Sequence, residues 1–224
     1  LIENGILQEV HVERHTKRGL VGNIYRGKVS RVLPGMQAAF VDIGLDKAAF
    51  LHASDIVIHN EVVGEVSTSH IEKHDIRDLV RDGQDIVVQV VKDPIGTKGA
   101  RLTTDITIPS RYLVFMPSVT HVGVSQRIED EAERERLKEL VAEFCDEEGG
   151  FILRTAAEGV SQPELKADAA FLRRLWSKIQ QRMKKRRSHV LYEDLPLARR
   201  VLRDFVGTEL DRIRIDSNLS HHEL

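Results

Sequence analysis

The sequence predicts an α+β protein in which a small closed β-barrel is followed by a part built from both helices and strands. Between Asn23 and Asp105 apolar residues recur with a period of two and glycines interrupt the pattern, which is typical of short strands. After Pro109 the apolar period changes to that of amphipathic helices. The 224 residues include 41% hydrophobic and 30% charged side chains, so wholesale disorder is excluded.

Five strands are expected in the barrel, with a turn at Pro34-Gly35. They cover residues 24–33, 36–43, 47–51, 86–92 and 100–106. Residues 57–80 are polar and read as an inserted loop with one short helix near Ile76. Five short strands with one long insertion favour closure into a barrel.

The second part is expected to combine strands at 112–116 and 151–155 with two longer helices. A helix over 131–145 follows from Leu137, Leu140, Val141 and Phe144, which recur on one face. The next helix opens with the capping-box pattern from Ser161 to Glu164 and closes at the basic run 184–187. A further helix after Asp194 and a strand at 212–216 complete the prediction.

Both ends of the sequence indicate a fragment of a longer protein. Asn4-Gly5 predicts a hairpin turn whose first strand would retain only Leu1 and Ile2, and a polar stub follows the predicted strand at 212–216. No apolar run approaches the roughly 18 residues of a membrane span. No signal peptide precedes the first strand, so we expect a cytoplasmic protein.

The composition excludes some kinds of binding site. The single cysteine, Cys145, excludes a disulfide framework and a zinc site built from several thiolates, and its place in a predicted helix indicates packing. A net charge of -2 argues against a uniformly basic nucleic-acid coat, although one basic face remains compatible with it.

Two phenylalanines are predicted to lie on the outer face of the barrel. If Ala39, Val41 and Ile43 face the core, Phe40 faces outward with Ala38 and Asp42, and the same alternation turns Phe50 outward beside His52. The neighbouring strand places Arg26, Lys28 and Ser30 on one face. Exposed rings beside cations form a stacking platform for unpaired bases. The alternative, that the insertion or the second part covers both rings, remains open at this stage.

Three blocks resemble the ribosomal S1 type of OB-fold, which binds single-stranded RNA on this face. They are Gly27-Lys28-Val29-Ser30-Arg31-Val32, Ala39-Phe40-Val41-Asp42-Ile43-Gly44 and Ala49-Phe50-Leu51-His52-Ala53-Ser54-Asp55-Ile56. Three further blocks extend the likeness: Asn23-Ile24-Tyr25-Arg26-Gly27-Lys28, Lys98-Gly99-Ala100-Arg101-Leu102-Thr103-Thr104 and Arg154-Thr155-Ala156. Together they resemble the amino-terminal half of the ribonuclease E/G family, and within it the ribonuclease G branch.

The resemblance implies four segments. A split, incomplete RNase H-like subdomain would comprise residues 1–22 and 208–224, with a five-stranded S1-type OB-fold barrel at 23–109 inserted into it. An α/β five-prime sensor subdomain would span 110–207. By the same resemblance Phe40, Phe50 and Lys98 match RNA-contacting positions, with Lys28 and Arg26 alongside. Arg154 and Thr155 match a pair that holds a five-prime monophosphate, and Val114 matches a position near the terminal nucleotide. Ser110 replaces a glycine of the family's pattern.

The chemistry of an Arg-Thr pair suits a monophosphate. A guanidinium offers a planar fork to two phosphate oxygens, and a hydroxyl donates a further hydrogen bond. A triphosphate brings more charge and bulk than this pair accommodates. The expected ligand is therefore single-stranded RNA with a five-prime monophosphate.

The family cleaves RNA with aspartates that hold magnesium, and those motifs are absent from this sequence. The resemblance therefore implies a magnesium-dependent endoribonuclease, active in ribosomal RNA maturation and messenger RNA decay, whose catalytic carboxylates lie outside this fragment. The intact enzyme is expected to be a homo-oligomer, with zinc possible at the link between its subunits, also absent here. No cofactor and no cleavage are expected of the fragment itself.

Two other functions remain open. The first is a non-catalytic S1-type RNA-binding module in translation or RNA chaperoning, which would lack the end preference of the Arg154-Thr155 pair. The second is a metal-dependent hydrolase that uses His70 with His74 or His11 with His15, pairs with helical spacing but no evident third ligand.

Overall fold

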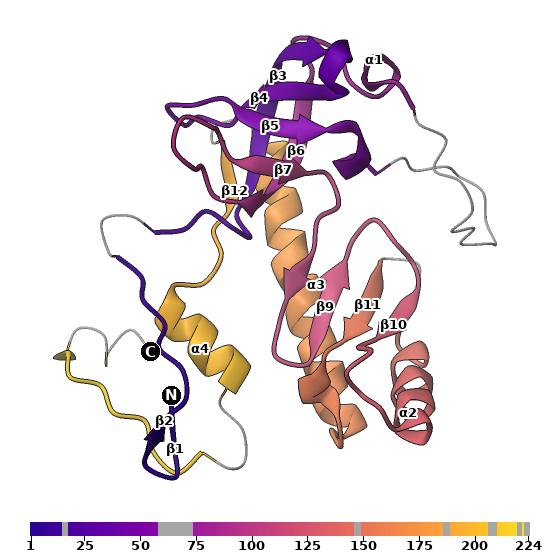
Figure 1. Ribbon diagram of the computed structural model, residues 1–224. Helices are drawn as coiled ribbons and strands as arrows, with labels where there is room; N and C mark the ends of the chain where they lie inside the picture. Colours follow the sequence, from indigo (N-terminus) through magenta and orange to yellow (C-terminus); the bar gives the residue numbers. More distant parts are fainter. Residues whose placement is uncertain are drawn as a thin grey trace. The chain divides into compact units, whose positions relative to one another are not determined.

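The computed structural model describes residues 1–14, 18–57, 74–145, 149–185, 189–205, 210–218 and 221. The chain forms two compact units (Figure 1): one joins Leu1–Gly19 with Asp194–Leu224, and the other is Leu20–Glu193. The chain is a mixture of helices and strands, as predicted. Within the described ranges no helix is long and apolar enough to cross a membrane.

A closed five-stranded barrel forms the first half of the larger unit. Its strands are β3 (Ile24–Leu33), β4 (Ala38–Asp42), β5 (Ala49–His52), β6 (Asp85–Lys92) and β7 (Arg101–Thr103). They pair in the order β3-β4-β5-β7-β6, and β6 pairs back onto β3 from Gln89 opposite Ile24 to Asp85 opposite Lys28. The only parallel pair in this ring is β5 with β7. The arrangement is that of an OB-like barrel, which confirms the predicted closure.

The barrel encloses its own apolar core. Val29, Val41 and Leu51 are fully buried there, and α1 (Ile76–Leu79) adds the buried Ile76. Gly27 permits the close approach of β3 to β4, because a Cβ at this position would lie 2.4 Å from Val41 Cγ1. The short helix falls where the sequence placed it, whereas residues 58–73 of the predicted insertion lie outside the described ranges.

A second sheet and two helices complete this unit. The sheet has the order β10-β11-β9-β8, with strands β8 (Ile108–Pro109), β9 (Leu113–Met116), β10 (Val122–Val124) and β11 (Gly150–Leu153). The helices α2 (Glu131–Ala142) and α3 (Gln162–Lys184) pack against it through Leu137, Val141, Leu165 and Leu172. The predicted capping box at Ser161 and Glu164 is confirmed.

Strand β3 joins the two halves of the larger unit. β12 (Val190–Tyr192) pairs antiparallel with it at Tyr25 and Ile24. Ile24 belongs to the core of the second sheet, whereas Tyr25 belongs to the barrel core. The sequence did not predict β12, because three residues give no measurable period.

The smaller unit contains a short hairpin and one helix. Strands β1 (Ile2–Glu3) and β2 (Ile6–Leu7) pair across Asn4 and Gly5, whose φ angles of 50° and 77° fit the predicted turn. Helix α4 (Leu197–Phe205) is tied to the amino-terminal segment by Glu13, which accepts from the Leu197 backbone N–H at 3.0 Å and pairs with Arg200.

Four details of the sequence prediction are wrong. Residues 212–216 form no strand, because the described residues offer them no partner strand. Cys145 lies just beyond α2, which ends at Ala142, and its thiol contacts the Gly149 carbonyl oxygen at 3.7 Å. Ala38 is buried although the alternation turned it outward. The last barrel strand covers Arg101–Thr103 only, since the backbone bends at Thr104. The predicted RNase H-like and sensor subdomains, with their boundaries, stay predictions.

Candidate nucleic-acid interface

The two predicted rings lie side by side on the outer face of the barrel. Phe40 and Phe50 are direct cross-strand partners in β4 and β5, and their ring centroids are 6.3 Å apart in an edge-to-face arrangement. His52 continues the row, with its ring 6.4 Å from that of Phe50. All three side chains are partly exposed, while Ala39, Val41, Ala49 and Leu51 fill the core on the other side of the strands. The rings therefore form a continuous, accessible platform, which we call the aromatic face (Phe40, Phe50 and His52).

Cations border the aromatic face, only some of them at the positions predicted from the sequence. Lys28 is exposed and lies opposite Asp42. A β-bulge between Val29 and Arg31 shifts the register, so Arg31 rather than Ser30 stands opposite Phe40. Ser30 instead donates from its hydroxyl to the Phe40 carbonyl oxygen at 3.1 Å. Strict alternation assigned Arg31 to the inner face, which is why the prediction missed it.

On the other flank, Arg101 stands opposite Phe50 in the parallel pair of β5 and β7. Its guanidinium binds the Asp55 carboxylate through two hydrogen bonds, Nε to Oδ2 at 2.9 Å and Nη2 to Oδ1 at 3.2 Å. This side-chain hydrogen bond raises the pKa of Arg101 above its ordinary value. Arg101 therefore contributes a fixed, oriented positive group at the edge of the aromatic face.

Lys98 is exposed in a tight loop next to the start of β5. Its backbone N–H and carbonyl both pair with Ile95, at 3.0 and 3.2 Å. Gly99 lets this loop touch the strand, because a Cβ there would lie 1.9 Å from the Ala48 carbonyl oxygen. The Phe50 backbone N–H donates to the Ala100 carbonyl oxygen at 2.7 Å. The structure thus brings Lys98 near the aromatic face although almost 50 residues separate it from Phe50.

Arg26 takes a different role from the one predicted from its face on β3. Its guanidinium Nη2 donates to the carbonyl oxygen of Met183, at the carboxyl-terminal end of α3. Cations at this end of a helix offset the partial negative charge of its carbonyls. Arg26 therefore holds α3 against the barrel.

The predicted phosphate-binding residues lie at the end of β11. Arg154 precedes the short 3-10 helix η3 (Thr155–Ala157) and is partly buried, while Thr155 is exposed. Val114 and Ile152 are cross-strand partners on one face of the sheet, and Arg154 follows Ile152 by two residues on the same face. The Thr155 hydroxyl lies 3.3 Å from that of Ser125. The structure therefore brings Val114, Arg154 and Thr155 together.

A loop before β9 orients the Arg154 guanidinium. Its Nη1 donates to the carbonyl oxygens of Ser110 and Arg111, at 2.5 and 3.4 Å, and the Arg154 backbone N–H donates to Tyr112 O at 2.8 Å. The loop is in turn anchored to α3 by Asp168. One carboxylate oxygen of Asp168 accepts from the Ser110 hydroxyl at 2.6 Å and from the backbone N–H groups of Tyr112 and Leu113 at 3.0 and 3.1 Å.

The sequence does not indicate this anchor, because Asp168 resembles any other helix carboxylate. The departure from the family's glycine at position 110 now has a structural consequence. The Ser110 hydroxyl adds one of the three hydrogen bonds that Asp168 accepts, and the side chain is almost completely buried.

The chain that follows Thr155 is held from α2. Glu133 accepts two hydrogen bonds from the Arg136 guanidinium, at 2.6 and 2.7 Å, and one from the Gly159 backbone N–H at 2.8 Å. Arg136 also donates to the Val160 carbonyl oxygen at 3.2 Å. The side-chain hydrogen bond from Arg136 is the main cause that lowers the pKa of Glu133 to about 2. At neutral pH this charged pair therefore fixes the loop that follows Thr155.

The metal-dependent alternative depends on the predicted pairs His11 with His15 and His70 with His74. Among the described residues no three His, Cys, Asp or Glu side chains gather closely enough to hold a metal ion. His15 and His70 lie outside the described ranges, so the two predicted histidine pairs are each described by one member only, His11 and His74.

The sequence is similar to that of known ribonucleases. Residues 107–224, more than half of the chain, match the model of the Ribonuclease E/G family. Ribonuclease G of Escherichia coli (strain K12) is 66% identical over 224 residues, which cover 100% of this chain and 46% of that protein. Ribonuclease G of Haemophilus influenzae is 63% identical with the same coverage, and Ribonuclease E of Nostoc sp. is 38% identical over 88% of this chain. The chain spans about half the length of the ribonuclease G relatives.

Proposed function

We propose that this chain, which belongs to the ribonuclease E/G family, is the RNA-binding and five-prime-monophosphate-sensing part of a single-strand-specific endoribonuclease. The intact enzyme would act in ribosomal RNA maturation and messenger RNA decay. The observation that carries the proposal is the pair of partly exposed rings, Phe40 and Phe50, in contact on one barrel face and bordered by cations.

The aromatic face suits unpaired bases. Each base that stacks on an aromatic ring contributes about 1–3 kcal/mol without regard to sequence. A duplex buries the faces of its bases, so the rings favour single strands. Lys28, Arg31 and Lys98 lie where they can neutralise phosphates on either side of the stacked bases.

The phosphate-binding residues suit the beginning of a strand. A guanidinium has five N–H donors in a planar fork, so contacts with the Ser110 loop and with a phosphate are compatible. Thr155 supplies an exposed hydroxyl next to Arg154. Hydrogen bonds on both sides, from the Asp168 anchor and the Glu133–Arg136 pair, hold this geometry before RNA arrives and reduce the ordering cost of binding.

We place RNA cleavage outside these 224 residues. The described side chains do not fit a metal centre, so no step of phosphoryl chemistry is assigned to them. The magnesium ligands of the intact enzyme, and the zinc link of its homo-oligomer, would belong to the rest of the protein. The expected result with magnesium is therefore RNA binding without turnover, and robust cleavage by this chain would contradict this part of the proposal.

The decisive experiment compares three oligonucleotides of one sequence that carry a five-prime monophosphate, hydroxyl or triphosphate. Charge-assisted hydrogen bonds contribute about 1.5–3 kcal/mol, so we expect at least roughly tenfold tighter binding of the monophosphate. Arg154→Ala should abolish that preference and leave the hydroxyl affinity unchanged. Phe50→Ala should weaken all three alike. Lys138→Ala, an exposed substitution on α2, serves as the matched control.

The second candidate is a non-catalytic RNA-binding module in translation or RNA chaperoning. The same aromatic face supports it, because a barrel of this kind needs no end recognition to bind RNA. Equal affinity for all three ends, unchanged by Arg154→Ala, would favour this function.

A further inference from the structure

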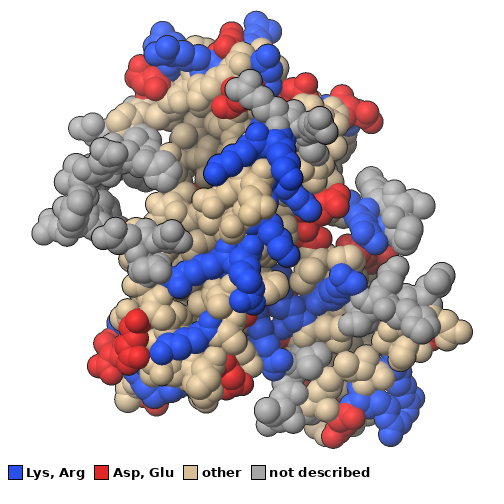
Figure 2. All heavy atoms as spheres, turned by 180° about the vertical axis from the view of Figure 1, so that it is seen from behind, with Lys and Arg blue, Asp and Glu red and all other residues tan. Residues whose placement is uncertain are grey.

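Helix α3 carries an unusual run of charge. From Ala169 to Lys185 the sequence contains six cations and no carboxylate, although the whole chain has a net charge of -2. The cations are Arg173, Arg174, Lys178, Arg182, Lys184 and Lys185. Figure 2 shows lysine and arginine side chains gathered across the middle of the face turned away in Figure 1. Such a local excess creates a positive field that the net charge conceals.

Part of this run lies on the exposed side of the helix. Arg174 and Lys178 are four residues apart, which places them on one face of α3, about 6 Å apart along its axis. Lys185 follows directly after Lys184, the last residue of the helix. All three are exposed, and Phe171, 50% exposed, lies one turn before Arg174. We call these four residues the α3 stripe.

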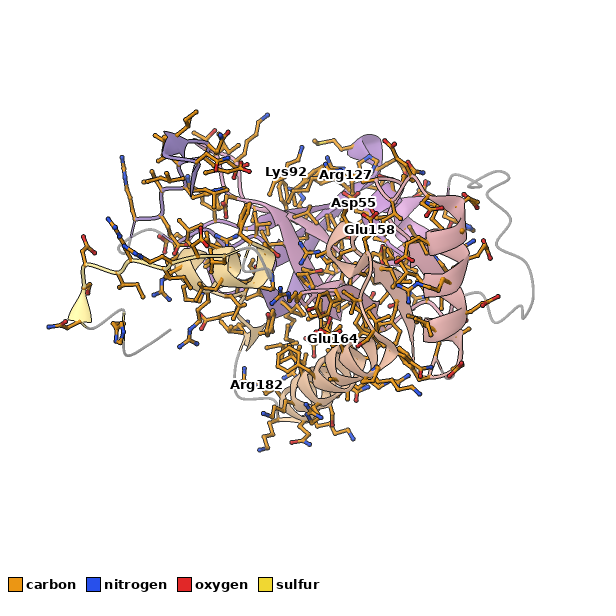
Figure 3. The ribbon with its side chains drawn as sticks, turned by 90° about the horizontal axis from the view of Figure 1, so that it is seen from below. Asp55, Lys92, Arg127, Glu158, Glu164 and Arg182 are labelled. Atoms are coloured by element: carbon orange, nitrogen blue, oxygen red, sulfur yellow. The ribbon has the colours of Figure 1, made fainter. Side chains whose placement is uncertain are left out.

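The neighbouring cations of α3 have structural contacts, in contrast to the stripe. Arg173 donates to the Phe144 carbonyl oxygen at 2.8 Å, and Arg182 donates to the Leu191 carbonyl oxygen at 3.0 Å. Among the described residues no carboxylate forms an ion pair with Arg174, Lys178 or Lys185. Figure 3 shows α3 at the edge of the unit, with nitrogen-tipped side chains extending outward from it. Neither helix packing nor local ion pairing therefore explains the stripe.

We propose that the α3 stripe is a second RNA-binding surface, which holds the phosphate backbone of a longer RNA independently of the aromatic face and of Arg154. This inference builds on the proposed function, which supplies RNA as the ligand. Lysine and arginine that neutralise phosphates bind without sequence preference and release counterions. Phe171 adds one ring on which an unpaired base can stack.

An anionic membrane is the other surface that cations attract, but the helix fits it poorly. A helix that lies in a membrane interface inserts a broad apolar face. The apolar face of α3 is occupied, because Leu165, Ala169, Leu172 and Ile179 are buried in the core of the second sheet. Among the large apolar side chains of α3, Phe171 is the exposed one, and it lies one turn before Arg174. The charge thus favours a polyanion in solution.

The test uses the full 224-residue chain with the double variant Arg174→Gln/Lys178→Gln. Glutamine has a helix propensity close to that of lysine and arginine, so the helix should persist, and circular dichroism checks this. The ligands are two hydroxyl-ended RNAs, one of about eight nucleotides and one of about 30 nucleotides, titrated between 50 and 200 mM salt. The control variant Arg77→Gln/Lys138→Gln removes two exposed charges from α1 and α2.

For the long RNA, the slope of log affinity against log salt should become shallower by about 1.4, since each phosphate contact on a single strand contributes about 0.7. The loss of affinity in the variant should then be about sevenfold larger at 50 mM than at 200 mM salt. The short RNA should bind the variant and the original chain alike. The variant Arg174→Lys/Lys178→Arg should restore the original slope, since only charge is required.

Two results would overturn the inference. One is an unchanged slope for the long RNA, or a loss equal to that of the control variant. The other is binding of the chain to anionic vesicles that Arg174→Gln/Lys178→Gln abolishes while it leaves RNA binding intact. Failure of the original chain to bind the short RNA would instead contradict the proposed function, so the two failures are distinguishable.

Discussion

Asp168→Asn tests whether the phosphate-binding residues are positioned from α3. Asp168 contacts the Ser110 hydroxyl and two backbone N–H groups of the loop that receives Arg154, and it does not belong to the predicted ligand contacts. Asparagine keeps the size of the side chain and one acceptor oxygen but removes the negative charge. The substitution therefore weakens the anchor without creating a cavity.

The magnitude follows from the three hydrogen bonds. A hydrogen bond to a charged acceptor contributes about 1.5–3 kcal/mol to stability, whereas one to a neutral acceptor contributes about 0.5–1.5 kcal/mol. Each of the three hydrogen bonds to residue 168 should therefore be weakened by about 1 kcal/mol in Asp168→Asn. Because one oxygen accepts all three, the losses overlap, and we expect about 2 kcal/mol lower stability. If half of this free energy is lost from the ordering of Arg154, the ratio of affinities for monophosphate and hydroxyl RNA should fall about fivefold.

The assay measures the ratio of affinities for monophosphate and hydroxyl RNA, together with urea unfolding. A purely structural role would lower stability and leave the ratio unchanged. Asp130→Ala is the matched control, because it removes the N-cap of α2, where the carboxylate accepts from the Ala132 N–H at 2.9 Å. That change should cost about 1 kcal/mol and preserve the ratio. An unaltered ratio in Asp168→Asn would refute the positioning role.

Three further outcomes are expected. Phe40→Ala and Phe50→Ala should each weaken binding of a short RNA by about 1–3 kcal/mol. The double variant should lose less than the sum, because the rings touch; strict additivity would contradict a shared platform. The pKa of Glu133, about 2 when folded, lies below its ordinary 4.5. The stability from its pair with Arg136 is therefore present above pH 4.5 and is lost as the pH falls toward 2. Urea unfolding between pH 5 and 3 should show this loss of about 1–2 kcal/mol, discounted for the partly exposed Arg136, and Glu133→Gln should remove it. Gly99→Ala should lower the melting temperature by several degrees, because its Cβ would overlap the Ala48 carbonyl oxygen, and an unchanged melting temperature would disprove that strain.

Local periodicity predicted those parts of the fold whose pattern lies within one strand or helix. The bounds of β3 agree with the prediction, since its residues alternate between core and solvent over most of its length. The same reasoning was wrong for residues 212–216, because a strand needs a partner and alternation cannot show whether one exists. The pairing of β12 with β3 joins residues more than 160 positions apart, and no local pattern encodes it.

The sequence predicted the candidate ligand residues of the site but not the residues that hold them in position. Phe40 and Phe50 stand out because an aromatic ring is unusual at an outward-facing strand position, whereas Arg154 was predicted only from the resemblance of the Arg154-Thr155-Ala156 block. Arg31 was missed because a bulge, invisible in the sequence, reverses the face of the strand. The Asp168 anchor was missed because its partners are mainly backbone groups, which every residue possesses. Candidate ligand residues can thus be predicted from sequence when their chemistry is distinctive or a family pattern marks them, whereas the residues that position them require coordinates.

Strand β3 connects the two proposed ligand sites. It borders the aromatic face through Arg31, contributes Ile24 to the core beneath the second sheet, and holds the end of α3 through Arg26. Among the described strands, β3 pairs only within the barrel and with β12, but its Ile24 is buried in the core of the second sheet, so separating the two halves would expose that core. A strand whose first phosphate contacts Arg154 then presents its later bases to the aromatic face at a high effective concentration. The end preference should accordingly increase with RNA length until the strand spans both sites, and then remain constant.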